Sequence, residues 1–215
     1  MGRIEDLKDI HKGERCFIVG TGPSLNNTNL KLLRDEIVFG VNTFYKMGVP
    51  CKYYAVSDLF VWRNHKENIL HLPSLLFLSG HAAIEFAIHK APKFTFMKDP
   101  IVLLEIGIDK FAKDITNGLY NGQTVIYDIC LQVAYYMGFE RVYLLGVDAD
   151  YSKSHHFDGE QAENLSGGAA GDWSRVFRAH KLAKQIFEED GREILNATVG
   201  GKLEIYKRVK LEDIV

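Results

Sequence analysis

The chain has 215 residues, of which 47% are hydrophobic and 25% are charged, and its formal net charge is -2. This length and composition are typical of one globular domain with a self-sufficient core, so we expect a single domain over residues 1–215 with its core at about 14–208. The weakly acidic balance argues against bulk electrostatic binding of nucleic acid, and no nucleic-acid partner is expected.

The cysteines and the N-terminus carry information about the compartment. The three cysteines, Cys16, Cys51 and Cys130, form no C-x-x-C pair, and an odd number of scattered cysteines suits a reducing environment. Met1–Glu14 is polar and mixed in charge, unlike a secretory signal. No apolar stretch reaches the ~18 residues that cross a bilayer. We therefore expect a cytoplasmic protein, and leave a peripheral association with a membrane and a homo-oligomer open.

Short apolar runs alternate with helical patterns along the chain. In chain order the predicted strands are Cys16–Val19, Ile37–Val41, Tyr53–Val56, Leu75–Leu78, Phe94–Met97, Val142–Gly146, Glu193–Asn196 and Leu203–Tyr206. The predicted helices are Thr28–Arg34, His81–Lys90, Thr124–Met137 and residues 172–189. Several strands are continuously apolar, as strands covered on both faces are. The alternation predicts an α/β fold, a Rossmann-like and mostly parallel sheet with helices on both faces.

The first predicted strand runs into a turn of small residues, Gly20-Thr21-Gly22-Pro23-Ser24. Glycine permits close backbone approaches, and the backbone N–H groups at a helix start attract an anion. The spacing is neither G-x-G-x-x-G nor a P-loop. Two interpretations therefore stay open for Gly20, Gly22 and Ser24: a nucleotide-binding turn, or an ordinary tight turn between strand and helix.

Other polar residues follow later strands of the predicted sheet. Asn42 follows the second strand, Asp58 the third, and Asp148 the strand at Val142–Gly146. The segment Gly122-Gln123-Thr124 precedes a predicted helix and is expected to present free N–H groups. Because ligands bind beyond the carboxyl ends of the strands in such sheets, we expect these residues to form one nucleotide site. Taken singly, Asn42 closes a turn and Asp58 caps a helix.

Asp148 and Asp150 form an Asp-x-Asp pair of the kind that holds a divalent cation. Alternate residues of an extended chain point to opposite sides, so both carboxylates reach one ion only if the strand has already ended. We favour a role in turn formation and expect no required cofactor. Magnesium at these two residues belongs to an alternative described below.

Residues 150–171 form a polar stretch rich in glycine and histidine, which predicts a lid loop. His156 lies in this loop just beyond a strand end and is our candidate for a general base near neutral pH. The alternative is an ordinary solvated loop histidine.

Four segments together resemble a known superfamily. They are Gly-Thr-Gly-Pro-Ser-Leu at 20–25, Val-Asn-Thr-Phe-Tyr at 41–45, the block Tyr120–Tyr151, and the tail Asn-Ala-Thr-Val-Gly-Gly-Lys-Leu-Glu-Ile at 196–205. The first three resemble bacterial sialyltransferases of glycosyltransferase family 42. They are more similar still to proteins grouped with the archaeal 6-hydroxymethylpterin pyrophosphokinases and with the motility accessory factors of flagellin glycosylation. The tail is similar to that of the second group, and the resemblance covers about residues 14–208.

The resemblance implies roles for individual residues. Gly22, Ser24, Asn42 and Asp58 would contact the nucleotide, and the turn Gly122–Thr124 would approach its phosphate and ribose. Tyr151 would stabilise a phosphate. The sequence departs from the sialyltransferases at two points. Asp172-Trp173 stands where they carry the histidine base, with His156 the nearest substitute, and Thr21 stands where they carry an asparagine.

Three functions follow as expectations. The first is a glycosyltransferase that binds a nucleotide-activated sugar, of the CMP-sialic acid or a related type, and transfers it to an acceptor glycan in surface polysaccharide synthesis. The second is a pterin-type pyrophosphokinase that uses ATP and magnesium. The third is a non-catalytic nucleotide-binding module. We favour the first.

Overall fold

The computed structural model describes residues 3–88, 100–150, 157–159 and 173–215. Its centre is an eight-stranded sheet in the order β10-β9-β8-β1-β2-β3-β4-β5, in which every neighbouring pair is parallel. Its strands are β1 (Arg15–Val19), β2 (Val38–Val41), β3 (Tyr53–Val56), β4 (Leu75–Leu78), β5 (Ile101–Val102), β8 (Arg141–Leu145), β9 (Glu193–Asn196) and β10 (Lys207–Arg208). A separate parallel pair joins β6 (Glu105–Ile108) and β7 (Leu119–Asn121).

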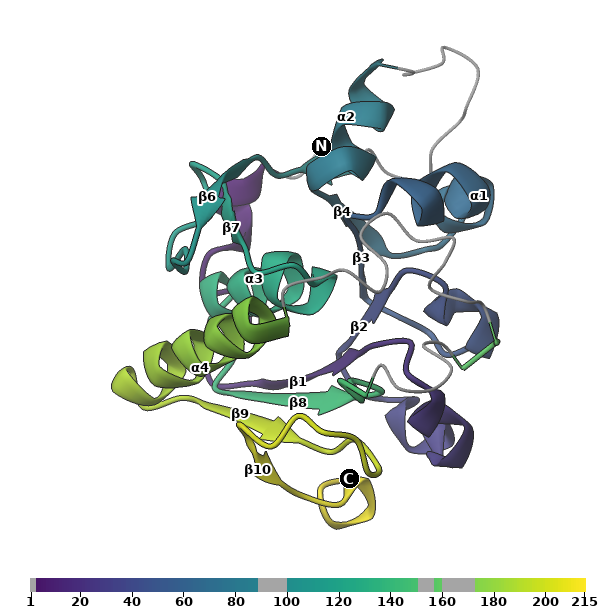
Figure 1. The fold of residues 1–215 in the computed structure, drawn as a ribbon, viewed down its shortest axis with the longest axis vertical. Coiled ribbons are helices and arrows are strands. Elements are labelled where there is room, and N and C mark those ends of the chain that lie inside the picture. Colours follow the sequence, from purple (N-terminus) through teal and green to yellow (C-terminus); the bar gives the residue numbers. More distant parts are fainter. Residues whose placement is uncertain (1–2, 89–99, 151–156, 160–172) are drawn as a thin grey trace.

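Helices cover both faces of the large sheet (Figure 1). The α-helices are α1 (Leu59–Leu70), α2 (Gly80–Ile88), α3 (Gln132–Tyr136) and α4 (Trp173–Glu189), and a π-helix at Ile126–Leu131 leads into α3. Short 3-10 helices span Ile4–Leu7, Pro23–Asn27, Leu30–Leu33, Phe44–Met47 and Leu211–Asp213. The fold is thus the predicted Rossmann-like α/β domain with a mostly parallel sheet.

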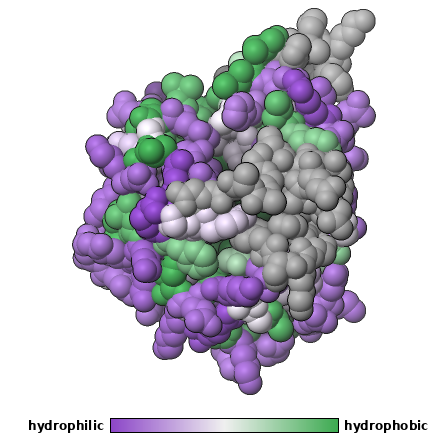
Figure 2. All heavy atoms as spheres, viewed as in Figure 1, coloured by the Kyte–Doolittle hydropathy of each residue, from purple (hydrophilic) through white to green (hydrophobic). Residues whose placement is uncertain are grey.

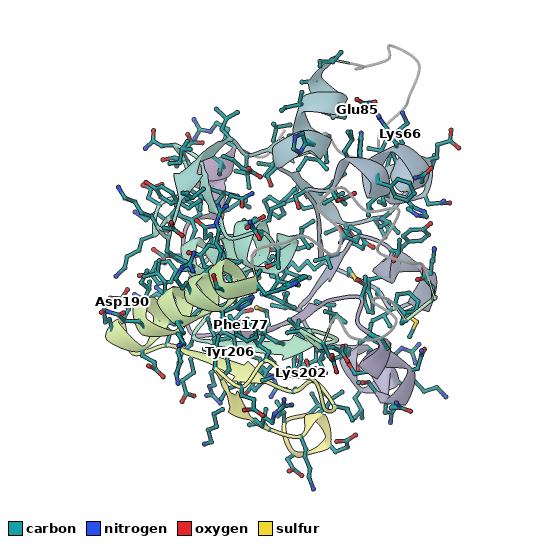
Figure 3. The ribbon with its side chains drawn as sticks, in the orientation of Figure 1. Lys66, Glu85, Phe177, Asp190, Lys202 and Tyr206 are labelled. Carbon is teal, nitrogen blue, oxygen red and sulfur yellow. The ribbon has the colours of Figure 1, made fainter. Side chains whose placement is uncertain are left out.

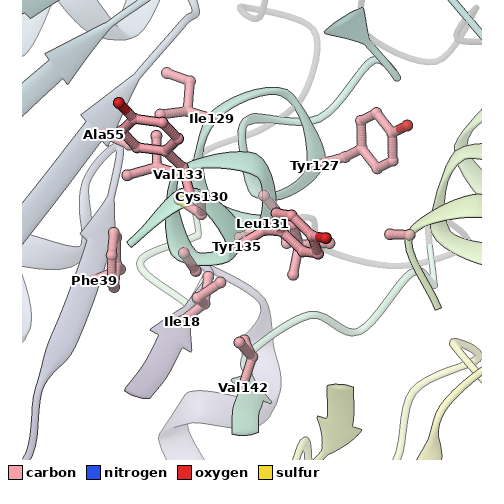
Figure 4. Close-up of a cluster of buried hydrophobic side chains, with 14 of the residues drawn as sticks. Ile18, Phe39, Ala55, Tyr127, Ile129, Cys130, Leu131, Val133, Tyr135 and Val142 are labelled. Atoms are coloured by element: carbon pink, nitrogen blue, oxygen red, sulfur yellow. The ribbon is translucent and has the colours of Figure 1, made fainter. Parts of the chain in front are cut away.

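The core lies on both sides of the sheet because alternate residues of each strand point to opposite faces. In β1, Cys16 and Ile18 join the cluster under α3 and α4, whereas Phe17 and Val19 join a second cluster on the other face. Figure 4 shows Ile18 packed among residues of the π-helix and α3. This two-sided burial explains why the strands read as continuous apolar runs.

Most predicted elements are confirmed, with three differences. The stretch predicted as a helix at Thr28–Arg34 contains only a short 3-10 helix, Leu30–Leu33. The predicted strand Leu203–Tyr206 is wrong: Leu203 and Tyr206 are buried core residues, and the strand β10 comes directly afterwards. Strands β5 to β7 were not predicted, and for helix α1 only its cap at Asp58 was considered, without its extent. The predicted strand Phe94–Met97 lies outside the described residues.

The surface visible in Figure 2 is mostly hydrophilic around its rim, with hydrophobic side chains in smaller groups. Within the part of the chain that the structure describes, no helix combines the length and the apolarity needed to cross a membrane.

Candidate functional site

The order of the strands locates the first part of the site. From β1 the chain builds outward through β2, β3, β4 and β5, and it later returns to place β8, β9 and β10 on the other side of β1. The direction of winding therefore reverses between β1 and β8. In open parallel sheets a ligand binds beyond the carboxyl ends of the strands at this reversal. The turns that meet there are Gly20–Ser24 after β1 and Gly146–Asp150 after β8.

A hydrogen-bonded pair, Ser24 and Asp148, occupies this reversal point. The Ser24 hydroxyl donates to Asp148 Oδ2 at 2.8 Å, and the Ser24 backbone N–H donates to Oδ1 at 3.2 Å. Burial raises the pKa of Asp148, and the hydrogen bonds from Ser24 partly oppose that rise. The negative charge of Asp150 raises the pKa further. Asp148 is therefore a carboxylate that accepts a proton more readily than an exposed aspartate does.

The glycines of the first turn allow a close approach to the turn after β8. The Gly20 N–H donates to Leu145 O and the Gly22 N–H to Gly146 O, both at 2.8 Å. A Cβ on Gly20 would lie 2.5 Å from Gly146 O, and one on Gly22 would overlap the Asp148 carboxylate. These N–H groups thus have partners within the chain. The contact of Gly20 and Gly22 with a nucleotide remains a prediction.

The C-terminal tail holds the Asp148 turn from the other side. The Lys202 N–H donates to Asp148 O at 2.6 Å, and the Lys202 ammonium pairs with Asp150 at 2.8 Å. The Thr198 hydroxyl accepts a hydrogen bond from the Val147 N–H at 3.2 Å. Lys202 lies on the chain that follows β9 (Figure 3). The tail pattern was visible in the sequence, but its contact with Asp148 was not predicted.

Two residues at the carboxyl edge of the large sheet have strained backbones. Asn42 after β2 and Ala149 after β8 have φ values of +51° and +49°. Gln123, which follows β7 of the separate strand pair, has a φ of +73°. Such conformations are costly for residues other than glycine and occur often at functional sites. Asn42 Oδ1 is also buried and has no hydrogen-bond partner among the described residues, whereas the Asn42 carbonyl accepts from the Tyr54 hydroxyl at 2.8 Å. An unpaired buried amide oxygen at a strand end is suited to a ligand donor.

Asp58 has the structural role that its position predicted. Its Oδ1 accepts the Val61 N–H at 2.9 Å and caps the N-terminus of α1. A contact with nucleotide remains a prediction for this residue.

The turn Gly122–Thr124 is supported from below by Asp128. The Gly122 N–H donates to Asp128 Oδ1 at 2.6 Å, and the Gln123 N–H donates to the Asn121 side chain at 3.0 Å. The expectation of free N–H groups is therefore wrong for Gly122 and Gln123. Burial raises the pKa of Asp128 to about 8, so its carboxyl is mostly protonated at neutral pH. Asp128 lies in the π-helix, a form common at functional sites, and sequence periodicity gave no signal for it.

A short described stretch of the predicted lid crosses the first turn. The Phe157 N–H donates to Thr21 O at 2.8 Å, the Asn26 side chain donates to Phe157 O at 3.1 Å, and Lys46 pairs with Asp158 at 2.6 Å. These contacts join the segment after β8 to the ends of β1 and β2. The predicted catalytic residues Tyr151 and His156, together with most of the lid at 150–171, lie outside the described residues.

The Asp-x-Asp pair, Asp148 and Asp150, follows strand β8. Strand β8 ends at Leu145, so the condition for Asp148 and Asp150 to reach one ion is met. Among the described residues, however, no three His, Cys, Asp or Glu side chains are grouped as a metal site.

Comparison with known proteins yields one family. The sequence model described as "6-hydroxymethylpterin diphosphokinase MptE-like" matches residues 2–154. No curated protein and no solved structure matches the chain significantly. The predicted resemblance to the pterin pyrophosphokinase group is confirmed, and the resemblance to sialyltransferases remains a prediction. The match spans the strands from β1 to β8 and ends before α4 and the tail.

Proposed function

The chain belongs to the 6-hydroxymethylpterin diphosphokinase MptE-like family, and from that membership we propose a nucleotide-dependent transferase that moves a diphosphate group from ATP to a pterin alcohol. The nucleotide would lie over the carboxyl ends of β8, β1 and β2. The sequence alone led us to favour sugar transfer over diphosphate transfer. The family match leads us to favour diphosphate transfer instead.

One structural observation carries the placement of the nucleotide. The Ser24–Asp148 pair lies where the winding of the sheet reverses. At the next strand end lies the buried Asn42 Oδ1, which pairs with no residue in the described part of the chain. A nucleotide brings hydroxyl and amino donors that would satisfy Asn42 Oδ1. Strain at Asn42 and Ala149 supports the same place, because strained conformations persist where function requires them.

The proposed transfer needs a base and a held donor. The oxygen of the pterin alcohol attacks the β-phosphorus of ATP, the bond from that phosphorus to the oxygen bridging the α- and β-phosphates breaks, and AMP leaves. The alcohol proton passes to a protein group. We propose His156 for this role, because an imidazole is an effective base near neutral pH.

Magnesium fits this reaction with two carboxylates. Magnesium in phosphate sites is commonly held by one or two carboxylates together with the substrate's own phosphates. Each Asp148 oxygen accepts one hydrogen bond from Ser24, which leaves acceptor capacity on both oxygens. Asp148 and Asp150 would hold the ion, and the bound ion would neutralise charge on the phosphates.

Sugar transfer is the competing function. It would use the same edge of the sheet for its nucleotide, but the bond that breaks joins the sugar to the phosphate, and the acceptor is a glycan. A panel of ATP and of CMP-, UDP- and GDP-sugars, each with and without magnesium, therefore distinguishes the two through the thermal stabilisation that a bound ligand confers.

Replacing Asn42 with glycine tests the nucleotide site. Glycine accepts the left-handed backbone at this position, so the fold is expected to persist while the side chain is lost. We expect about tenfold weaker binding of ATP, equivalent to one hydrogen bond, by isothermal titration calorimetry. Asn64→Ala on the exposed side of α1 is the control and should bind as the wild type does. Unchanged affinity in Asn42→Gly would place the nucleotide elsewhere.

A further inference from the structure

A second polar cluster lies at the same edge of the sheet, beyond β3 and β4. It contains Ser79, which follows β4, and Glu105, Asn121 and Arg175, which come from β6, β7 and α4. The strands β1 and β4 are separated by β2 and β3, so the end of β4, where Ser79 lies, is about 14 Å along the sheet from the end of β1 at the usual spacing of strands. It is therefore separate from the nucleotide site proposed above.

The carboxylate of Glu105 is held in place although it is exposed. Glu105 Oε2 accepts a hydrogen bond from the Asn121 side chain at 3.1 Å. Arg175 in turn donates to Asn121 O at 2.7 Å and to Asn121 Oδ1 at 3.1 Å. Exposed carboxylates are ordinarily free to move among rotamers, so a carboxylate fixed through an amide and a guanidinium is prepared to bind.

The backbone at Gly80 makes room for this carboxylate. Gly80 has a φ of +55°, and a Cβ at this position would lie 2.7 Å from Glu105 Oε1 and 3.3 Å from Ser57 O. Glu105 Oε1 is thus brought to the carboxyl ends of β3 and β4. Oε1 therefore faces this edge of the sheet, while the other oxygen, Oε2, accepts the hydrogen bond from Asn121.

Ser79 supplies an independent sign of a missing partner. It is fully buried, and its hydroxyl oxygen has no hydrogen-bond partner among the described residues. Its backbone is satisfied, because its N–H donates to Val56 O at 3.2 Å and its carbonyl accepts from the Ala83 N–H at 3.2 Å. A buried hydroxyl without a partner lowers the free energy of unfolding. The Ser79 hydroxyl is therefore suited to form its hydrogen bond with a ligand.

We infer that the carboxyl ends of β3 and β4 form the acceptor subsite, in which Glu105 binds paired N–H donors on the edge of a flat nitrogen heterocycle. A carboxylate matches two adjacent donors, such as a ring N–H beside an amino group. Asp128, directly behind the turn, is mostly neutral near pH 7, so Glu105 supplies the negative charge of the cluster. This inference rests on the proposed function, since it assigns the binding of the transferase's acceptor.

The test uses two variants of the full chain and 6-hydroxymethylpterin as the probe. Glu105→Gln keeps an acceptor for Asn121 but loses the charge and one acceptor. We expect at least tenfold weaker pterin binding by calorimetry with unchanged ATP binding. Ser79→Ala removes the unpaired hydroxyl. It should bind pterin more weakly while the free protein keeps or gains thermal stability. Glu193→Gln, an exposed glutamate at the start of β9, is the control and should bind as the wild type does.

The outcomes separate this inference from the proposed function. Wild-type pterin binding in Glu105→Gln overturns the acceptor subsite and leaves the transferase intact. A loss of ATP binding instead, with 2′-deoxy-ATP bound equally by the variant and the wild type, would mean that Glu105 binds a ribose hydroxyl, and this too overturns the subsite. A wild-type protein that binds neither ATP nor the pterin contradicts the proposed function itself.

Discussion

Replacing Gly22 with valine should lower the free energy of unfolding by about 3 kcal/mol, a large fraction of the stability of a single domain. The backbone of Gly22, with φ -64° and ψ 154°, suits any residue, so the loss comes from lack of space. A Cβ would lie 2.6 Å from Asp148 Cγ and 2.7 Å from Gly146 O. The Asp148 turn would have to move away from β1. Urea denaturation measures this loss.

A double-mutant cycle with the smaller substitution Gly22→Ala separates the two obstacles to a side chain at this position, the Asp148 carboxylate and Gly146 O. Gly22→Ala should cost less in an Asp148→Gly background, because one of the two obstacles is gone and only Gly146 O remains. Gly200→Ala is the control: its φ is +74° with nothing within 4 Å, so it should cost only the left-handed conformation, about 1–2 kcal/mol. A Gly22→Val protein as stable as the wild type would show that the two turns do not approach as described.

Asp128 should make the protein less stable as the pH rises from about 4 to about 8. The ordinary pKa of this carboxyl is 3.8, and burial raises it to about 8 in the folded chain. Below about pH 4 the folded and the unfolded chain both keep the Asp128 proton, so this carboxyl makes no contribution to the pH dependence of stability. Between the two values the unfolded chain releases the proton and the folded chain keeps it, so stability falls by at most 1.36 kcal/mol for each pH unit. Above about pH 8 both states are ionised and the fall ends.

Asp128→Asn should reduce this slope in urea denaturation between pH 5 and 8, because an amide does not titrate. The charges facing Asp128 are Glu105 on β6, which raises its pKa, and Arg175 on α4, which lowers it. Asp148, whose pKa is also raised, contributes a slope of the same sign. His180 contributes a slope of the opposite sign, because burial lowers the pKa of its imidazole to about 4. Comparison with the wild type isolates Asp128. A slope unchanged in Asp128→Asn would contradict the raised pKa.

The sequence could predict the sheet because each strand is buried on both faces and reads as an apolar run. It could also predict that polar residues after β1, β2 and β8 meet at one edge, since parallel strands place their carboxyl ends together. Asp58 indicated a helix start, but the extent of α1 could not be predicted because its residues Leu59–Leu70 include polar and charged positions at the surface. Strand β5, which has only two residues, could not be predicted either.

The side-chain partners of the site could not be read from the sequence for a different reason. The contacts of Asp148 with Ser24 and Lys202 join residues far apart in the chain, and their distances depend on the path of the intervening backbone. The N–H groups of Gly122 and Gln123 looked free because their partners are side chains of Asp128 and Asn121 rather than backbone carbonyls. Glycine indicated space at Gly22, but the side chain that fills this space is a carboxylate of the protein itself.

The most direct test of the proposed transferase is to identify the products formed by the full chain from ATP, magnesium and 6-hydroxymethylpterin in its oxidised and dihydro forms. ³¹P NMR and mass spectrometry follow AMP and the pterin diphosphate ester. We expect the two products in equal amounts, and a large loss of rate in Asp148→Asn, which loses one of the two carboxylates proposed to hold magnesium. Consumption of a sugar nucleotide with ATP left intact, or no product from any donor of the panel, would contradict diphosphate transfer by this protein.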